Sequence, residues 1–242
     1  MASSDSNARR FLDAFANIEN ILKRQQRHEW DDSQYVAFGD LLDKSRTVHH
    51  AHKKELRAYA ILRNSIAHNR YLNGQPIAEP REDIVDSILK IERHLEHPLS
   101  VLEATSNFDI PQIFSPDDDL GEFLTLVKEK DFSQAPVKTS EGFSLITTNA
   151  IARWFADSME TDGGIVDSTP IREVLNFAET GDRLKTVRQP CSTVKAVRIL
   201  SGTAGEKEEP PAALLVLGKA EQPPQRLVTR SDLALLYSKL EV

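Results

Sequence analysis

The C-terminal half of the sequence contains one order of elements twice, and this repeat limits the possible folds more than any other feature. The first copy has an amphipathic helix from Leu120, two strands within 135–147, and a helix directly after them. The second copy has a helix through Leu200, two strands within 213–229, and again a helix. Such a repeat predicts an α/β domain. The predicted bounds are 108–242 for the domain, about 110–157 for its first repeat, and about 185–241 for its second.

Composition separates this domain from the residues before it. Residues 1–97 carry 15 Lys and Arg against 15 Asp and Glu, whereas the remainder carries 15 against 22. All seven His residues also lie in the first part. A composition break of this kind indicates a domain boundary. The net charge of -7 argues against a chain that coats nucleic acid through bulk positive charge.

The first part is predicted to be helical. Apolar residues recur at helical spacing from Ala8 to Arg27, within 32–71, and between Pro80 and Pro98. Glu82 and Asp83 suit the first turn of the last helix, because carboxylates stabilise the positive end of a helix dipole. These helices predict a small antiparallel bundle over residues 8–97. The expected fold class is therefore an all-α bundle followed by an α/β domain.

The segment Arg63-Asn64-Ser65-Ile66-Ala67-His68 concentrates groups that can act on a phosphodiester. A guanidinium binds phosphate, and a neutral imidazole can accept or give a proton near neutral pH. Asn64 and His68 are four residues apart and share a helix face, whereas Arg63 and His68 are about 140° apart. One copy is thus awkwardly arranged, and two copies meeting across a twofold axis would build one phosphate cleft.

This pattern, Arg-Asn-x-x-x-His at the end of a long helix inside a bundle of about 90 residues, resembles HEPN domains, which occur in many prokaryotic ribonucleases. The resemblance covers residues 8–97. It implies a homodimer that cuts single-stranded RNA without a metal, with the 2'-hydroxyl as nucleophile. By resemblance, Arg63 binds the scissile phosphate, His68 is the general acid or base, and Asn64 positions them. An antitoxin or another regulatory protein is a further partner that the resemblance allows.

The repeat in the second part is similar to a tandem pair of CBS motifs, the Bateman module. The second repeat carries the strand-Thr-x-x-Asp-helix signature at Thr229 to Asp232, whereas the first has Ala150 in place of the Asp. In modules of this kind the Asp accepts hydrogen bonds from ribose hydroxyls, and the Thr contacts ribose or phosphate. The resemblance therefore implies one adenine nucleotide site per chain, for AMP, ADP or ATP, using Thr229 and Asp232. Arg230 is the expected phosphate ligand.

Structural roles for the same residues remain open at this point. Arg63 could pair with Glu55 or another acidic residue, and His68 could cap its helix. Thr229 and Asp232 could form a helix cap without any ligand. The main hypothesis is an endoribonuclease regulated by an adenine nucleotide. The alternative is a non-catalytic nucleotide-sensing dimer that binds RNA or a protein.

Other classes of protein are disfavoured by the residue types. The single Cys191 excludes an internal disulfide, and no carboxylate or Cys stands at ligand spacing beside His49, His50 and His52, so no metal site is expected. No apolar run approaches the roughly 20 residues that a membrane span needs. Residues 1–11 lack the apolar core of a secretory signal. The expectation is a cytoplasmic protein without membrane contact.

Overall fold

The computed structural model describes residues 6–26, 36–68, 78–161, 168–203, 209–218 and 222–240. The chain divides into two compact units, which we call the helical unit (1–99) and the α/β unit (100–242). Within the described residues, no helix is both long enough and apolar enough to cross a bilayer.

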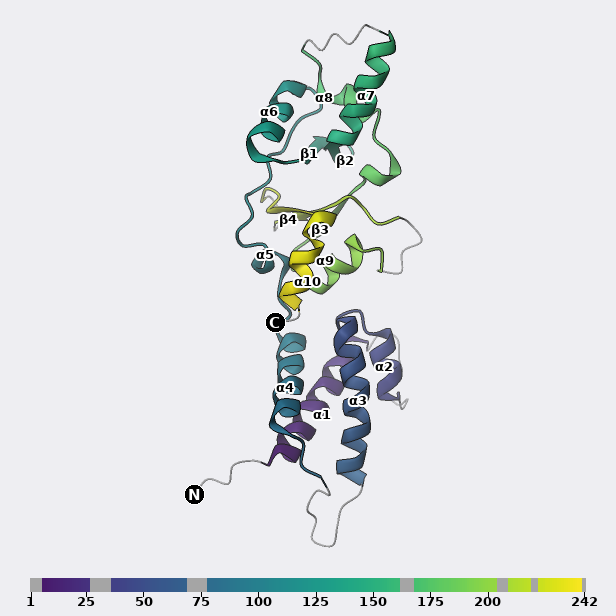
Figure 1. Ribbon diagram of the computed structural model, residues 1–242, viewed down its shortest axis with the longest axis vertical. Coiled ribbons are helices and arrows are strands. Elements are labelled where there is room, and N and C mark those ends of the chain that lie inside the picture. The colour runs from purple at the N-terminus through teal and green to yellow at the C-terminus, as the bar shows by residue number, and fades with distance from the viewer. Residues whose placement is uncertain are drawn as a thin grey trace. The chain divides into compact units, whose positions relative to one another are not determined.

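The helical unit is built from three long helices and one short helix (Figure 1). Their bounds are α1 (Asn7–Gln25), α2 (Phe38–Lys44), α3 (His50–His68) and α4 (Glu82–Glu96). The helical region expected within 32–71 is two helices among the described residues, and the break between them lies in the polar stretch after Lys44, where the sequence allows one. Ser6 caps α1 by accepting a hydrogen bond from the Arg9 backbone N–H.

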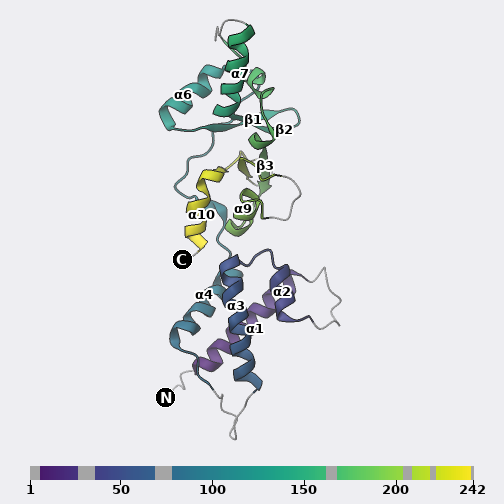
Figure 2. The same cartoon turned by 45° about the vertical axis from the view of Figure 1, so that its right-hand side comes forward.

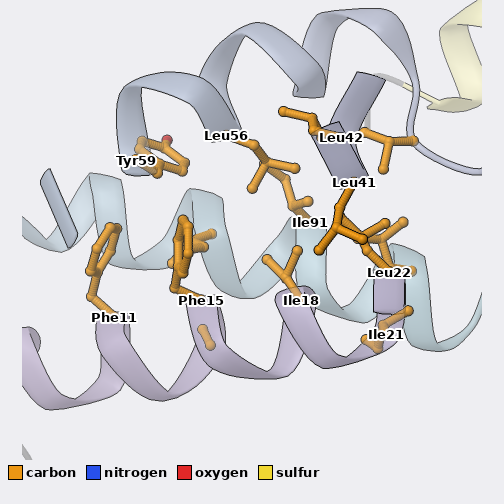
Figure 3. Packing of buried hydrophobic residues seen from close by; sticks show 14 of the residues in the cluster. Phe11, Phe15, Ile18, Ile21, Leu22, Leu41, Leu42, Leu56, Tyr59 and Ile91 are labelled. Atoms are coloured by element: carbon orange, nitrogen blue, oxygen red, sulfur yellow. The ribbon is translucent and has the colours of Figure 1, made fainter. Parts of the chain in front are cut away.

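The helices enclose one apolar core (Figure 3). The side chains of Phe11 and Phe15 from α1, Leu41 from α2, Leu56 from α3 and Ile91 from α4 are almost completely buried in it. The Phe11 and Tyr59 rings meet edge to face, with their centroids 5.8 Å apart. Burial of such side chains contributes about 1.5–3 kcal/mol each, so this core is the main reason the helices associate.

The expected antiparallel packing holds only in part. The ring of His52 lies beside that of His94, and Ser87 donates to Glu55, so α3 and α4 run in opposite directions. By contrast, Arg10 pairs with Glu82 at 2.8 Å, close to the first residues of both α1 and α4. These two helices are parallel because three long helices in an up-down-up order align the third with the first.

The α/β unit contains two small sheets with helices packed on them (Figures 1 and 2). The first repeat comprises α6 (Leu120–Lys130), β1 (Gln134–Thr139), β2 (Gly142–Thr147) and α7 (Thr148–Thr161), and α8 (Ile171–Leu175) is buried in the same apolar core. The second comprises β3 (Leu184–Arg188), α9 (Thr193–Leu200), β4 (Ala213–Leu217), β5 (Arg226–Thr229) and α10 (Leu233–Leu240). The short helix α5 (Val101–Ala104) packs with it, and the Val101 backbone N–H donates to the carbonyl oxygen of Cys191. Two 3-10 turns, η1 (Thr180–Asp182) and η2 (Arg230–Asp232), complete the unit.

The two repeats share one pairing register. β1 pairs antiparallel with β2, which sets Thr147 opposite Gln134, and β4 pairs antiparallel with β5, which sets Thr229 opposite Ala213. β3 runs parallel to β4, and the single bridge between Phe114 and Val137 is its counterpart in the first repeat. Thr147 and Thr229 therefore occupy equivalent positions, each at the end of a strand that leads into a helix.

Candidate nucleotide site

The second repeat brings its two signature residues into direct contact. Thr229 is the last residue of β5, and η2 turns the chain so that its third residue, Asp232, faces back. The backbone N–H and the hydroxyl of Thr229 donate to the same carboxylate oxygen, Oδ2 of Asp232, at 2.7 and 2.9 Å. The second oxygen, Oδ1, has no partner among the described residues, so this carboxylate keeps acceptor capacity.

This second junction (Thr229–Asp232) opens on a pocket of about 460 Å³. Residues from three segments, 107–112, 131–136 and 227–232, line the pocket together with Leu126 of α6. The volume falls within the usual range for small-molecule sites. The topology thus assembles a cavity at the place where the sequence predicts a ligand.

The pocket combines apolar surface with a few polar groups. Its apolar side chains include Phe108, Ile110, Leu126, Phe132 and Leu227. Ile110 is 64% exposed and Phe132 is 42% exposed, which places both among the most exposed large apolar side chains of the described residues. A flat, largely apolar ring is the kind of group that would cover such surface favourably.

Arg230, the expected phosphate ligand, does not line the pocket. Its guanidinium donates from Nε to the carbonyl oxygen of Pro211 at 2.9 Å, and from Nη2 to that of Pro210. The side chain therefore ties η2 to the segment that precedes β4.

The first junction (Thr147–Ala150) uses the equivalent groups differently. Ala150 is completely buried, and its backbone N–H donates to the Thr147 hydroxyl at 3.0 Å. That hydroxyl in turn donates to Oδ1 of Asp182 at 3.0 Å. Asp182 is only 8% exposed and is also bound by the guanidinium of Arg153. The Thr147 hydroxyl and the Arg153 guanidinium therefore both bind the Asp182 carboxylate, one at each oxygen.

Asp109 lines the pocket and Asp182 belongs to the first junction, and neither was predicted from the sequence. Asp109 lies five residues before Phe114, which bridges to the fourth residue of β1. Asp182 likewise lies five residues before Val187, which pairs with the fourth residue of β4. Asp109 lines the pocket beside Thr229, just as Asp182 contacts Thr147. The shared offset was visible in the sequence, but its meaning depends on a pairing register that the sequence alone does not show.

The predicted catalytic residues lie on the last turns of α3. The Arg63 guanidinium donates to Oδ1 of the exposed Asn64 at 2.9 Å and to Oε2 of Glu19 at 3.4 Å. It also lies 5.5 Å from the centre of the Phe15 ring. Arg63 is thus paired with Glu19 rather than Glu55, although its side chain stays 36% exposed. His68 is the last residue of α3, and its side chain lies outside the described residues.

Four His rings of the helical unit lie near one another without forming a metal site. The ring centroids of His49 and His50 are 4.3 Å apart, and those of His52 and His94 are 6.0 Å apart. Over the described ranges, no group of three or more His, Cys, Asp or Glu side chains is arranged to hold a metal ion. Burial lowers the pKa of both His52 and His94, because the charged imidazolium is poorly solvated there.

No protein-family model and no curated protein matches this chain. Solved structures of CBS-domain proteins do match. The crystal structure of CBSX2 in complex with AMP has a TM-score of 0.39 and 14% identity, covering 60% of this chain and 99% of that chain. A CBS domain-containing protein of unknown function from Bacillus anthracis str. Ames Ancestor has a TM-score of 0.41 and 14% identity, and the match covers 60% of this chain and 96% of that chain. The crystal structure of CbpB in complex with c-di-AMP has a TM-score of 0.34 and 14% identity, and the match covers 60% of this chain and 87% of that chain.

Proposed function

We propose that the α/β unit binds one adenosine-type ligand per chain at the second junction and that the protein acts as a regulator that responds to this ligand. One observation carries this proposal: Thr229 and Asp232 meet at the mouth of a pocket whose exposed apolar side chains suit a purine ring. The free Oδ1 of Asp232 is placed to accept hydrogen bonds from ribose hydroxyls, which are charge-assisted and therefore strong.

The first junction supports a single site rather than two. Its Asp182 carboxylate is buried and already bound by Thr147 and Arg153. A ribose there would have to displace these partners, and an unpaired buried charge costs several kcal/mol. Binding at the second junction requires no such exchange.

Thermal unfolding of wild type and of Asp232→Ala with adenosine, AMP, ADP and ATP tests the proposal. A ligand at 100 times its Kd stabilises the folded state by about 2.7 kcal/mol, which raises the Tm by roughly 5–10 °C. We expect this rise for wild type and its loss in Asp232→Ala.

Asp119→Ala is a matched control because it also removes an aspartate that caps a turn. Asp119 accepts from the Gly121 backbone N–H at the start of α6, away from the pocket. The ligand should raise the Tm of this variant as much as that of wild type. No rise with any of the four ligands in wild type would refute the proposal.

The second candidate function is a metal-independent endoribonuclease of the HEPN type, acting on single-stranded RNA as a homodimer. The observation in its favour is that the Arg63 guanidinium and the Asn64 amide lie together on an exposed helix turn, two turns or less from His68. Arg63 could bind a phosphate only by giving up its ion pair with Glu19, so cleavage would depend on how easily this ion pair opens. The adenine ligand would then act by changing how two chains assemble, provided that it binds the two arrangements with different affinity.

Labelled single-stranded RNA, incubated with the full chain and a chelator, tests this second candidate. Cutting that survives the chelator and is lost in His68→Ala is expected, with His50→Ala as a control at the opposite end of the same helix. Glu19→Gln should increase cutting, because it releases the Arg63 guanidinium. Equal cutting by wild type and His68→Ala would exclude the assignment of His68.

A further inference from the structure

The pocket at the second junction is lined by carboxylates from each of its three segments. Asp109 comes from the segment before β1, Asp131 from the end of α6, and Asp232 from η2. No Lys, Arg or His is among the described residues that line it. These three aspartates are the charged side chains of the described lining, and all three are acidic.

The two arginines nearest to Asp232 in the sequence, Arg226 and Arg230, are directed elsewhere. Arg226 donates from Nε to the carbonyl oxygen of Thr105 at 3.0 Å and from Nη1 to that of Gln225 at 2.6 Å. Arg230 binds the carbonyls of Pro210 and Pro211. Both guanidinium groups thus donate to backbone carbonyl oxygens, and neither lines the pocket where it could bind a ligand phosphate.

We propose that this pocket selects an adenosine nucleoside without phosphate groups and rejects adenosine di- and triphosphates. The inference rests on the proposed adenosine site and specifies its ligand. Two unit charges about 4 Å apart in water interact by about 1 kcal/mol, and by more where the surroundings exclude water. Because the carboxylates are partly exposed, each added phosphate should weaken binding by roughly three- to tenfold at low salt.

Isothermal titration of the full chain at low salt, with a chelator present, measures this selection. The expected order of affinity is 5'-amino-5'-deoxyadenosine at least equal to adenosine, then AMP, ADP and ATP. The amino compound is the sharpest probe, because it replaces the 5'-hydroxyl by a cation of nearly equal size. Raising the salt concentration should narrow the differences, since ions screen the carboxylates.

Asp131→Asn identifies the source of the selectivity. Asp131 has a φ of 56°, and Asn tolerates this left-handed conformation, so the substitution removes charge with little change to the backbone. The ratio of adenosine to AMP affinity should fall severalfold in this variant. Glu122→Gln changes the net charge by the same amount on α6 outside the pocket lining, and it should leave the ratio as in wild type.

The outcomes separate this inference from the proposed function. Tighter binding of AMP, ADP or ATP than of adenosine would overturn the charge selection but keep the adenosine site. An unchanged ratio in Asp131→Asn would also overturn it. No binding of any of the five compounds would overturn the site and its selectivity together.

Discussion

The two junctions of the α/β unit have the same backbone plan and different side-chain chemistry. At the first, the Thr147 hydroxyl donates to Asp182, which Arg153 also binds, and this carboxylate is buried. At the second, the Thr229 hydroxyl donates to Asp232, which lines an open pocket. A repeat can therefore keep its register while one copy becomes part of the folded framework and the other stays available for a ligand.

The position of the carboxylate explains this difference. In the second junction it lies three residues after the Thr, on the turn that faces the pocket. In the first, that position is Ala150, and the carboxylate comes from Asp182 in η1, 35 residues away from Thr147 in the sequence. The first junction thus acts as a structural link within the unit.

Ala150→Asp should lower the free energy of unfolding more than any other change considered, because it places the Asp of the Thr-x-x-Asp signature in a buried position. Ala150 has no exposed surface, and Thr147 lies between it and Asp182. A second carboxylate there would be buried beside a like charge, at a cost of about 3 kcal/mol or more. Urea denaturation should show this loss, and Ala150→Asn measures the part that comes from the size and polarity of the side chain without its charge. A stable Ala150→Asp that binds two ligands per chain would break the comparison.

Asp182→Ala should be the next most damaging change. It removes the acceptor of the Thr147 hydroxyl and leaves the half-buried Arg153 without its nearest carboxylate, so we expect a loss of about 2 kcal/mol. Glu179→Ala is the control: this carboxylate also pairs with Arg153, at 3.4 Å, but it is 66% exposed and should matter by less than about 0.5 kcal/mol. Adenosine should still stabilise Asp182→Ala.

In the absence of ligand, Asp232→Ala should lower the free energy of unfolding less than Asp182→Ala does. The carboxylate closes one turn through Thr229, an interaction comparable to a helix cap, and its removal should cost about 1 kcal/mol. Chemical denaturation of the ligand-free protein measures this value. A loss larger than that of Asp182→Ala would reverse the structural and binding roles assigned to the two junctions.

The smallest effect concerns pH and distinguishes the two units, since all seven His lie before residue 98. Burial lowers the pKa of His52 from 6.5, although nearby Glu55 opposes this shift and His94, Lys90 and His50 reinforce it. The unfolded chain then binds a proton on His52 more readily than the folded chain does. The free energy of unfolding is therefore not reduced by this group above about pH 6.5, and it falls as the pH drops below that value. Amide hydrogen exchange should quicken in α3 and α4 between pH 7 and 5, after correction for intrinsic rates, more than in α7. His52→Gln should reduce this difference.

Local patterns predicted much of the fold, while long-range contacts decided the site. The stripes of α1 and α4 are visible because a helix repeats its buried face every three or four residues. The ion pair between Arg63 and Glu19 joins residues 44 apart, and no spacing rule selects Glu19 over Glu55. The pocket likewise depends on residues 107–136 meeting residues 227–232. The contact between Thr229 and Asp232 was predictable because they lie within one turn, whereas the positions of Asp109 and Asp131 depend on the packed unit.

The stoichiometry of adenosine binding tests the central claim most directly. Isothermal titration of the full chain should give one site per chain for wild type and for Asp119→Ala, and none for Asp232→Ala. Two sites per chain, or unchanged binding by Asp232→Ala, would contradict the assignment of one structural and one ligand-binding junction.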